Sequence, residues 1–304
     1  MTGENWTIAA LYRFVHIADT RAEKAILQPF CDARGICGTL LLAPEGINGT
    51  MAGPTKESME ELAALLNERF GMPRDEIKWA EADHKPFNRM KVRLKKEIIT
   101  MRQPQIDPVN QVGDYVDPQD WNALISQDDV IVLDTRNDYE TKLGIFKGAI
   151  DPQTKIFTEF AGYVEENLDP AKHKKVAMYC TGGIRCEKAS SYMLSKGFEK
   201  VYHLKGGILK YLETVSPEES LWDGACFVFD HRVGVEHGLA ETDHSVCFGC
   251  REPLTAAEQE SDQYIEGICC PHCADRLTPE RQKSLTDRNR SLKEQKLKQQ
   301  KKAS

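Results

Sequence analysis

Long apolar runs are missing from this sequence of 304 residues. No run approaches the roughly 20 residues that a membrane-spanning helix needs, so we expect no membrane contact. The first residues, Met1-Thr-Gly-Glu-Asn-Trp6, have no basic patch followed by an apolar stretch. This argues against a secretory leader and predicts a cytoplasmic protein.

Two motifs of redox enzymes are also missing. The chain has no Gly-x-Gly-x-x-Gly for a dinucleotide, and its histidines lack the spacing of a di-histidine carboxylate iron site. The sequence motifs therefore identify neither a group that would activate oxygen nor an electron donor. They also leave the oligomeric state open.

An overall excess of basic residues is absent, which restricts how the chain could bind nucleic acid. The net charge is -7, and residues 116–230 contain 13 Lys and Arg against 19 Asp and Glu. One local exception, the basic strip of residues 85–102, contains seven basic residues and one acid. It could follow an RNA backbone, with Phe87 stacking on a base, or simply guard a sheet edge with charge. Its central basic residues are Arg89, Lys91, Arg93 and Lys95.

The alternation of apolar patterns predicts an α/β and α+β chain. A strand-helix-strand-strand-helix-strand order comes first, typical of a ferredoxin-like βαββαβ domain. Buried strands that alternate with helices then indicate a parallel α/β sheet, whose ligands sit at the strand carboxyl ends. The expected regions are a ferredoxin-like domain (1–102), a proline-containing linker (103–120), a parallel α/β domain (121–220), a cysteine-rich region (221–279) and a helical or disordered basic tail (280–304).

Local signals within the first domain give more detailed expectations. Gly46-Ile-Asn-Gly49 is a turn signal, with residues 50–53 returning as a hairpin partner. The helix expected over residues 21–34 has Ala22, Ala25, Ile26 and Phe30 on one face.

Ten cysteines need an explanation in a cytosolic chain, where thiols stay reduced. Cys31, Cys37 and Cys226 are isolated, and we expect them to be buried. Cys247-x2-Cys250-x19-Cys270-x2-Cys273 has the spacing of a structural four-sulfur zinc site. Cys269 is then a spare thiol or an alternative ligand. Packed or disulfide-linked cysteines are the alternative to a metal.

The candidate reactive residue is Cys180, which follows the apolar run 176–179 and opens the loop Cys180-Thr-Gly-Gly-Ile-Arg185. Gly182 and Gly183 allow backbone N–H groups to point inward and form an anion nest. A helix expected near Glu187 adds the positive end of its dipole. Both features favour a thiolate, and Arg185 can reinforce them.

The loop and its flanks resemble the rhodanese family over about residues 116–220. Asp134-Thr-Arg136 matches the acid-x-Arg motif, Glu140 matches the following acidic position, and residues 204–207 match Leu-x-Gly-Gly. Residues 144–149 resemble Gly-His-Ile-x-Gly-Ala, although Ile145 stands where histidine is usual. Related cysteine phosphatases have a loop one residue longer and commonly a histidine before the cysteine, so the pattern argues against phosphatase activity.

The resemblance narrows further to the bacterial tRNA uridine hydroxylases. Residues 180–188, read Cys-Thr-Gly-Gly-Ile-Arg-Cys-Glu-Lys, follow a domain containing Ala43-Pro-Glu-Gly-Ile-Asn-Gly49 and precede a cysteine-rich end. The resemblance implies a tRNA-binding enzyme that forms 5-hydroxyuridine at the wobble position with molecular oxygen. It also implies Cys180 as the reactive thiol.

Two other functions remain open at the level of the residues. The loop also suits a persulfide-carrying sulfurtransferase, in which Cys186 acts as a resolving thiol. A rhodanese fold used only for binding is the third reading. The presence of the cysteine, the arginine and both glycines argues against it.

Overall fold

The computed structural model describes residues 5–229 and 232–303. Its contacts divide the chain into two compact units. The first contains Met1–Tyr115, Ile156–Val176 and Gly183–His203, and the second contains Val116–Lys155, Ala177–Gly182 and Leu204–Ser304. Within the described ranges, each helix is too short or too polar to cross a lipid bilayer.

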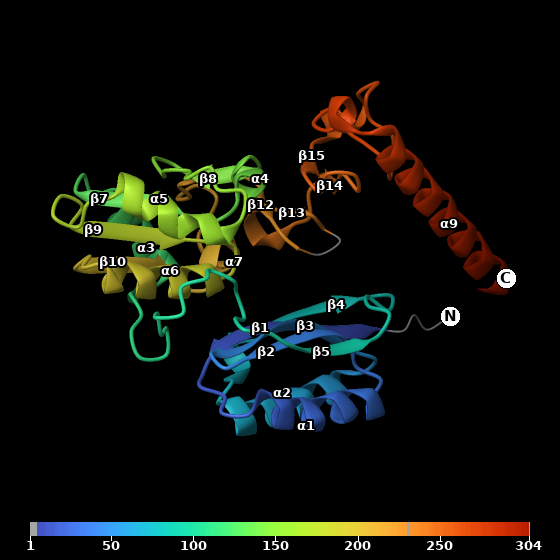
Figure 1. Ribbon diagram of the computed structural model, residues 1–304, viewed down its shortest axis with the longest axis horizontal. Helices are drawn as coiled ribbons and strands as arrows, with labels where there is room; N and C mark the ends of the chain where they lie inside the picture. Colours follow the sequence, from blue (N-terminus) through green and yellow to red (C-terminus); the bar gives the residue numbers. More distant parts are fainter. Residues whose placement is uncertain (1–4, 230–231, 304) are drawn as a thin grey trace. The chain divides into compact units, whose positions relative to one another are not determined.

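The N-terminal domain is a ferredoxin-like sheet with strand order β4-β1-β3-β2-β5. β5 pairs in parallel with β2, whereas the other neighbours are antiparallel. Figure 1 shows α1 and α2 side by side on one face of this sheet. The elements are β1 (Trp6–Phe14), α1 (Thr20–Ala33), β2 (Cys37–Ala43), β3 (Gly46–Gly53), α2 (Lys56–Phe70), a 3-10 turn (Arg74–Glu76), β4 (Lys78–Ala82) and β5 (Met90–Leu94).

Capping residues explain where the two helices begin. The Asp19 side chain accepts hydrogen bonds from the N–H groups of Arg21 and Ala22, and Thr55 accepts one from Ser58. Such caps satisfy amide groups that have no partner inside the helix. The expected inward face of α1 is wrong except for Phe30, which packs against the core: Leu27 and Cys31 are the buried residues, and Ile26 is 41% exposed.

The expected turn at Gly46–Gly49 is also wrong. β2 and β3 pair up to Ala43 and Gly46, so the turn consists of Pro44 and Glu45. The glycines serve close backbone approach instead: a Cβ on Gly49 would lie 2.3 Å from the Thr39 carbonyl oxygen. Glycine in a strand often marks such an approach, which is easily mistaken for a turn.

The central domain is a parallel sheet with strand order β6-β10-β9-β7. Its strands are β6 (Asp114–Val116), β7 (Val130–Asp134), β9 (Lys175–Tyr179) and β10 (Lys200–Leu204). The helical segments of this region are α3 (Pro118–Ile125), α4 (Asp138–Thr141), a 3-10 turn (Phe157–Glu159), α5 (Phe160–Asn167), α6 (Ile184–Ser195) and α7 (Gly207–Thr214).

The expected linker over residues 103–120 ends earlier than its prolines suggested. β6 lies inside it as an edge strand, and Pro118 is in the first turn of α3. Proline is favoured at that position because its missing N–H would have no partner there. The sequence of β6 is too short and too exposed to give a strand pattern.

A cluster of aromatic rings forms part of the core of the central domain. Phe146 lies edge-on to Tyr179 and Tyr211, with ring centroids 4.8 Å apart in each case. Phe146 belongs to β8 (Gly144–Phe146), which pairs with β11 (Trp222–Gly224). The first residues of the expected cysteine-rich region therefore complete the packing of the domain before it.

The cysteine-rich region contains short elements around a small core that includes Leu254, Ile268 and Leu285. Its small core suits a region that needs cross-linking or a metal for stability. The basic tail, expected as helical or disordered, is a helix. The elements are β12 (Cys226–Phe227), β13 (Gly234–Val235), a 3-10 turn (His237–Leu239), β14 (Ser245–Val246), β15 (Pro253–Leu254), α8 (Ala256–Gln259), a 3-10 turn (Ala274–Arg276) and α9 (Pro279–Ala303).

Candidate functional site

Cys180 follows β9, and the start of α7 holds the first half of its loop. The N–H of Ile208 donates to the Cys180 carbonyl at 3.0 Å, and that of Leu209 donates to the Thr181 carbonyl at 3.1 Å. Gly207, at φ +67°, permits this contact, because a Cβ there would lie 2.5 Å from the Cys180 oxygen. The Leu-x-Gly-Gly segment therefore has a structural purpose. Its second glycine lets α7 bind the cysteine loop.

The second half of the loop leads directly into α6. Gly183 has φ +108° and is the N-cap of α6, which begins at Ile184, before the expected start. A Cβ on Gly183 would lie 2.5 Å from the Tyr12 hydroxyl oxygen. That hydroxyl donates to Glu187 Oε1 at 2.8 Å. Gly183 is thus required both by its backbone angle and by the contact with Tyr12 of β1.

The candidate residues of the loop are largely buried. Cys180 is 1% exposed, Arg185 is 6% exposed and Cys186 is fully buried in the first turn of α6. The depressed pKa expected for Cys180 stays a prediction.

Thr181 joins the loop to two neighbouring segments. Its hydroxyl lies 3.3 Å from Glu140 Oε1 and 3.4 Å from the Phe227 carbonyl oxygen. Glu140 is fully buried and caps α4 together with Asn137. The acidic residue after the Asp-x-Arg motif therefore orients the residue next to Cys180.

The Asp-x-Arg motif itself forms a buried ion pair. Arg136 Nη2 lies 2.7 Å from Asp134 Oδ2, and both side chains are fully buried. Arg136 also donates to the carbonyl oxygens of Glu140 and Gly144. Burial alone would lower the pKa of Arg136, but Asp134 reverses this and raises it. The pair holds the α4 segment in place and is structural rather than part of the reacting group.

Lys188 is a buried cation that the sequence did not single out. Its side chain is fully buried in α6, and its Nζ donates to four oxygens of the first unit. The distances are 2.8 Å to each carboxylate oxygen of Glu45, 2.6 Å to Glu97 Oε2 and 2.8 Å to the Ile99 carbonyl. We name this cluster the lysine clamp. It fastens the helix after the cysteine loop to the β2–β3 turn and to the chain after β5.

The four cysteines of the predicted metal site come together. Their sulfur atoms all lie within 4.8 Å of one another. The Cys247–Cys273, Cys250–Cys270 and Cys270–Cys273 sulfurs are 3.8, 3.7 and 3.9 Å apart. Such a cluster could hold a metal ion.

Cys269 and His272 do not join that group. Cys269 Sγ donates to the Gln263 carbonyl, and His272 Nε2 lies 2.7 Å from Glu258 Oε1.

Burial would raise the pKa of Cys247, but hydrogen bonds from neighbouring N–H groups outweigh this effect, so that its pKa is lowered. The isolated cysteines Cys31, Cys37 and Cys226 are buried, as predicted.

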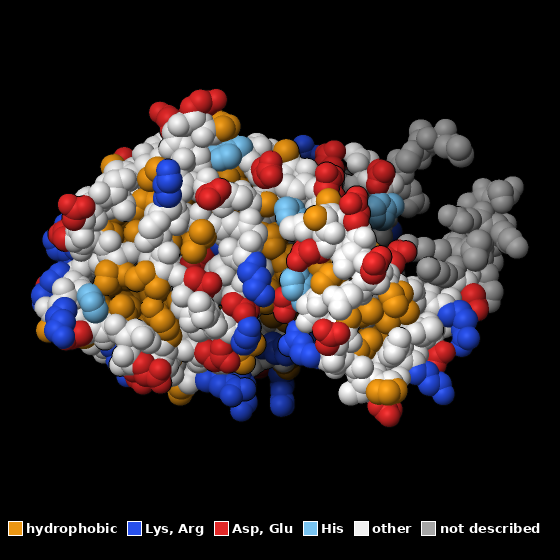
Figure 2. Space-filling model, turned by 90° about the horizontal axis from the view of Figure 1, so that it is seen from above, with side chains coloured by type: hydrophobic (Ala, Val, Ile, Leu, Met, Phe, Trp, Pro, Cys, Tyr) orange, Lys and Arg blue, Asp and Glu red, His pale blue; other side chains and the backbone are white. Residues whose placement is uncertain are grey.

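The basic strip lies along and beyond β5, at one edge of the N-terminal sheet. Arg89, Arg93 and Lys95 are exposed, and Lys91 is half-buried. This position is compatible with both an edge guard and a phosphate-binding surface. Figure 2 shows acidic and basic side chains interspersed on the face that it presents.

Comparison with family models identifies two domains. Residues 6–98 match the UPF0176 acylphosphatase-like domain, and residues 117–214 match the rhodanese-like domain. These two matches together span more than half of the chain. The structure therefore contains a rhodanese-like domain preceded by a family-specific N-terminal domain.

Solved structures similar to this chain cover only part of it. A protein of unknown function from Rhodopseudomonas palustris, described as "Possible Tyrosine Phosphatase", is 25% identical, and the match covers 34% of this chain and 83% of that one with a TM-score of 0.29. A full-length protein from Lactobacillus plantarum is 27% identical over 36% and 87% of the two chains, with a TM-score of 0.29. A rhodanese-like domain from Anabaena is 20% identical over 36% and 78%, with a TM-score of 0.31. At these TM-scores the structural matches do not indicate an activity for this chain.

Proposed function

We propose a function from the premise that this chain has the architecture of the UPF0176, or tRNA hydroxylase, family, an acylphosphatase-like domain followed by a rhodanese-like domain. The proposed reaction is the oxygen-dependent hydroxylation of the wobble uridine of tRNA to 5-hydroxyuridine. The observation that carries it is the complete cysteine loop Cys180–Arg185, which runs from the end of β9 into the first turn of α6 in a chain with this N-terminal domain.

The proposed chemistry uses the Cys180 thiolate as a nucleophile. Its sulfur bonds to carbon 6 of uracil, and the electrons of the carbon 5–carbon 6 double bond move toward the carbonyl at carbon 4. Molecular oxygen is first reduced to hydrogen peroxide with two electrons and two protons from an external reductant. Carbon 5 of this enolate then attacks one peroxide oxygen, and the oxygen–oxygen bond breaks. The other oxygen atom leaves as water. Loss of the carbon 5 proton and of the thiolate restores the double bond.

The rest of the loop would prepare this nucleophile. The start of α6 supplies the positive end of a helix dipole next to the loop, and the loop N–H groups favour an anion. Arg185 would steady the loop or the carbonyl oxygen of the substrate. Cys186 is buried in α6. In this proposal it would support the loop and would not react with the substrate.

A persulfide-carrying sulfurtransferase is the second candidate. The same six-residue loop favours it, because the rhodanese-like loop can hold an outer sulfur atom as an anion. In that reaction the Cys180 thiolate attacks the sulfane sulfur of a donor, and the rest of the donor leaves with the electron pair of the broken bond. An acceptor nucleophile then attacks the outer sulfur and releases the Cys180 thiolate.

We propose zinc as the metal of the four-cysteine cluster. A tetrahedral site with a zinc–sulfur distance of about 2.3 Å requires sulfur atoms about 3.8 Å apart. Three of the six sulfur–sulfur separations, at 3.7 to 3.9 Å, fit this requirement, and all six are within 4.8 Å. Four thiolates leave no open position, so the ion would stabilise the cysteine-rich region and take no part in the reaction.

We propose tRNA as the partner, with Arg89, Lys91, Arg93 and Lys95 of the basic strip in contact with its phosphates. Cations on and next to an edge strand can follow a polyanion without reading its bases. Recognition of a particular tRNA sequence then depends on other residues of the protein.

Mass spectrometry of tRNA nucleosides from cells with and without the protein tests the proposal. An added oxygen on uridine supports hydroxylation, whereas an added sulfur supports the sulfurtransferase. Trapping with tRNA that bears 5-fluorouridine separates the two intermediates, since a stable adduct through Cys180 requires addition at carbon 6. A sulfane sulfur on the purified enzyme without an adduct favours the persulfide route.

A further inference from the structure

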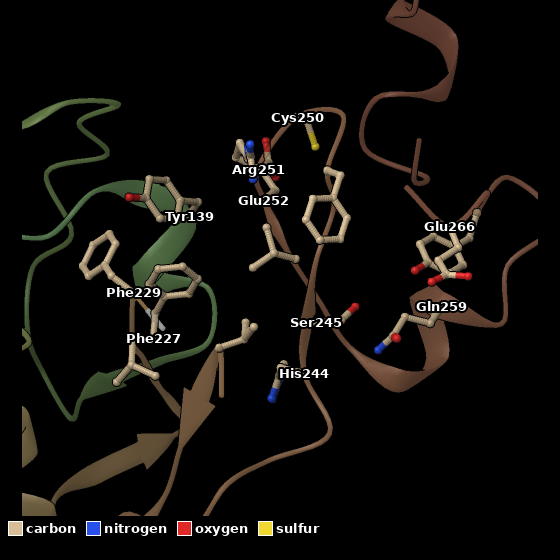
Figure 3. A pocket seen from close by; sticks show the side chains of 15 residues that line it. Tyr139, Phe227, Phe229, His244, Ser245, Cys250, Arg251, Glu252, Gln259 and Glu266 are labelled. Carbon is tan, nitrogen blue, oxygen red and sulfur yellow. The ribbon is translucent and has the colours of Figure 1, made fainter. Parts of the chain in front are cut away.

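A concave pocket of about 900 Å³ lies within the second unit, where Tyr139 of α4 and the segment around β12 face residues 244–266 of the cysteine-rich region. Ligand sites typically have volumes of roughly 300–1,000 Å³. No residue of the cysteine loop lines this pocket, and of the four clustered cysteines only Cys250 does. Figure 3 shows Tyr139, Phe227 and Phe229 on one side and Gln259 and Glu266 on the opposite side.

The walls of the pocket are rich in aromatic rings. Phe227 is edge-on to Tyr139 at 5.4 Å and to Phe229 at 5.1 Å between centroids. Phe229 is 69% exposed and Phe248 is 46% exposed. Large exposed aromatic side chains that gather in a hollow mark a binding surface, because burying them in the fold would otherwise be favourable.

The cysteine knuckle presents one of these rings together with a cation. Phe248 lies between Cys247 and Cys250, and Arg251 follows directly. The Arg251 guanidinium lies 5.7 Å from the centroid of the Phe248 ring. Arg251 has φ +73°, and its N–H donates to the Cys247 carbonyl at 2.8 Å, so the knuckle holds it in an unusual backbone conformation.

The opposite wall is tied to the cysteine loop. The Phe227 carbonyl and the Glu140 carboxylate, which follows Tyr139 in the chain, both lie within hydrogen-bond distance of the Thr181 hydroxyl. Thr181 is the residue next to Cys180. A ligand in the pocket would therefore contact Tyr139 and Phe227, and the Glu140 side chain and the Phe227 carbonyl next to these rings hold Thr181 in place.

We propose that this pocket binds one unpaired nucleobase of the tRNA anticodon loop by stacking. The proposal rests on the proposed function, since it takes tRNA as the substrate. Every base has a π-face that stacks on aromatic side chains without regard to sequence. His244 Nδ1 is bonded to Thr242 and Gln259 Nε2 to backbone carbonyls, which leaves His244 Nε2, Ser245 Oγ and Gln259 Oε1 as partners for the edges of a base.

The charges of the pocket favour a neutral base over a phosphate group. Glu252 and Glu266 both line it and would repel an anion. Glu252 is paired with Lys142 at 3.1 Å, which uses that cation within the protein. Arg251 is exposed and can meet the phosphate that flanks the bound base.

The test is a binding cycle with the full-length protein and RNA hairpins that have the sequence of the anticodon stem and loop. One set of hairpins carries a single abasic nucleotide at each loop position in turn. The protein variants are Phe229→Ala, Phe248→Ala and the control Ile156→Ala, which removes a 52% exposed side chain outside the pocket. Fluorescence anisotropy gives each dissociation constant, and circular dichroism verifies that each variant is folded.

Phe229→Ala should bind the intact hairpin about 5- to 150-fold more weakly, the range that corresponds to one base stacked on an aromatic ring. At one loop position, the abasic hairpin should bind the wild-type protein just as weakly. The variant should not distinguish that abasic hairpin from the intact one. Phe248→Ala should behave in the same way, and Ile156→Ala should bind like the wild type.

Three results would overturn the pocket as a base site. They are unchanged affinity of both phenylalanine variants, equal weakening for intact and every abasic hairpin, and no hairpin binding by the wild type. The proposed function fails separately, through the nucleoside analysis. A protein that shows the coupled loss but forms no 5-hydroxyuridine keeps the base site and loses the reaction. A Phe229→Ala protein that binds and modifies tRNA normally keeps the reaction and loses the base site.

Discussion

Replacing Lys188 by methionine should expose the energetic importance of the lysine clamp. Methionine preserves most of the volume of the side chain but leaves Glu45 and Glu97 facing each other without their cation. Removing one partner of a buried ion pair costs about 3–5 kcal/mol. The two carboxylates are each 19% exposed. We therefore expect the lower end of that range, about 3 kcal/mol, or roughly a 150-fold shift of the folding equilibrium.

The loss should depend on pH with a definite sign. Burial raises the pKa of Glu97, but hydrogen bonds from Lys188 and the Met101 N–H outweigh it, and the pKa falls below its ordinary value of 4.5. A carboxyl group with a lowered folded pKa contributes stability above its unfolded pKa and loses it as the pH falls through the folded value. In Lys188→Met that contribution is missing, and protonation relieves the repulsion between the carboxylates. The stability difference should thus be full at pH 7 and shrink below about pH 4.5.

Urea unfolding of the wild type and the variant at pH 7 and pH 4 measures this difference. Lys196→Met is the matched control, because Lys196 is exposed and its ion pair with Glu165 lies at the surface. Adding Glu45→Gln and Glu97→Gln to Lys188→Met should recover part of the loss at pH 7. The reasoning is refuted if Lys188→Met loses no more stability than Lys196→Met, or if its loss is the same at both pH values.

Three further predictions follow from the candidate site. Cys180→Ser should abolish tRNA modification with little effect on folding or tRNA affinity, and a wild-type modification rate would remove Cys180 from the mechanism. Elemental analysis of reduced protein should find about one zinc per chain, and Cys270→Ser should lower that content and the thermal stability; metal-free, fully folded wild type would contradict this. Alanine at Arg89, Lys91 and Arg93 should weaken tRNA binding and flatten its salt dependence by up to about 3 in the log-log slope, and an unchanged slope would assign these residues to guarding the sheet edge.

Features that depend on neighbouring residues were predictable from the sequence. The cysteine loop is contiguous, so its glycines and the following helix could be identified without knowing what surrounds them. The four-cysteine cluster depends on the short x2 spacing within each knuckle, which places two sulfurs on one turn. The apolar runs of β7, β9 and β10 likewise predicted a buried parallel sheet, because such strands are covered on both faces.

Partners distant in the chain could not be predicted in this way. Lys188 and Glu45 are 143 positions apart, and a lysine followed by Ala-Ser-Ser gives no sign that it will be buried. The inward face of α1 was misjudged for a related reason. Periodicity shows that a helix has an apolar side, but the sheet beneath it decides which residues are covered.

The sequence by itself predicted the types of domain, the candidate reactive cysteine and the grouping of the four cysteines that could hold a metal, because each depends mainly on motifs of residues close together in the chain. Only the tertiary structure decided the turn at Pro44 and Glu45, the lysine clamp and the aromatic pocket. These depend on backbone register and on side chains that packing brings together from separate segments. No local pattern encodes that convergence, since its free energy arises from burial shared among several segments.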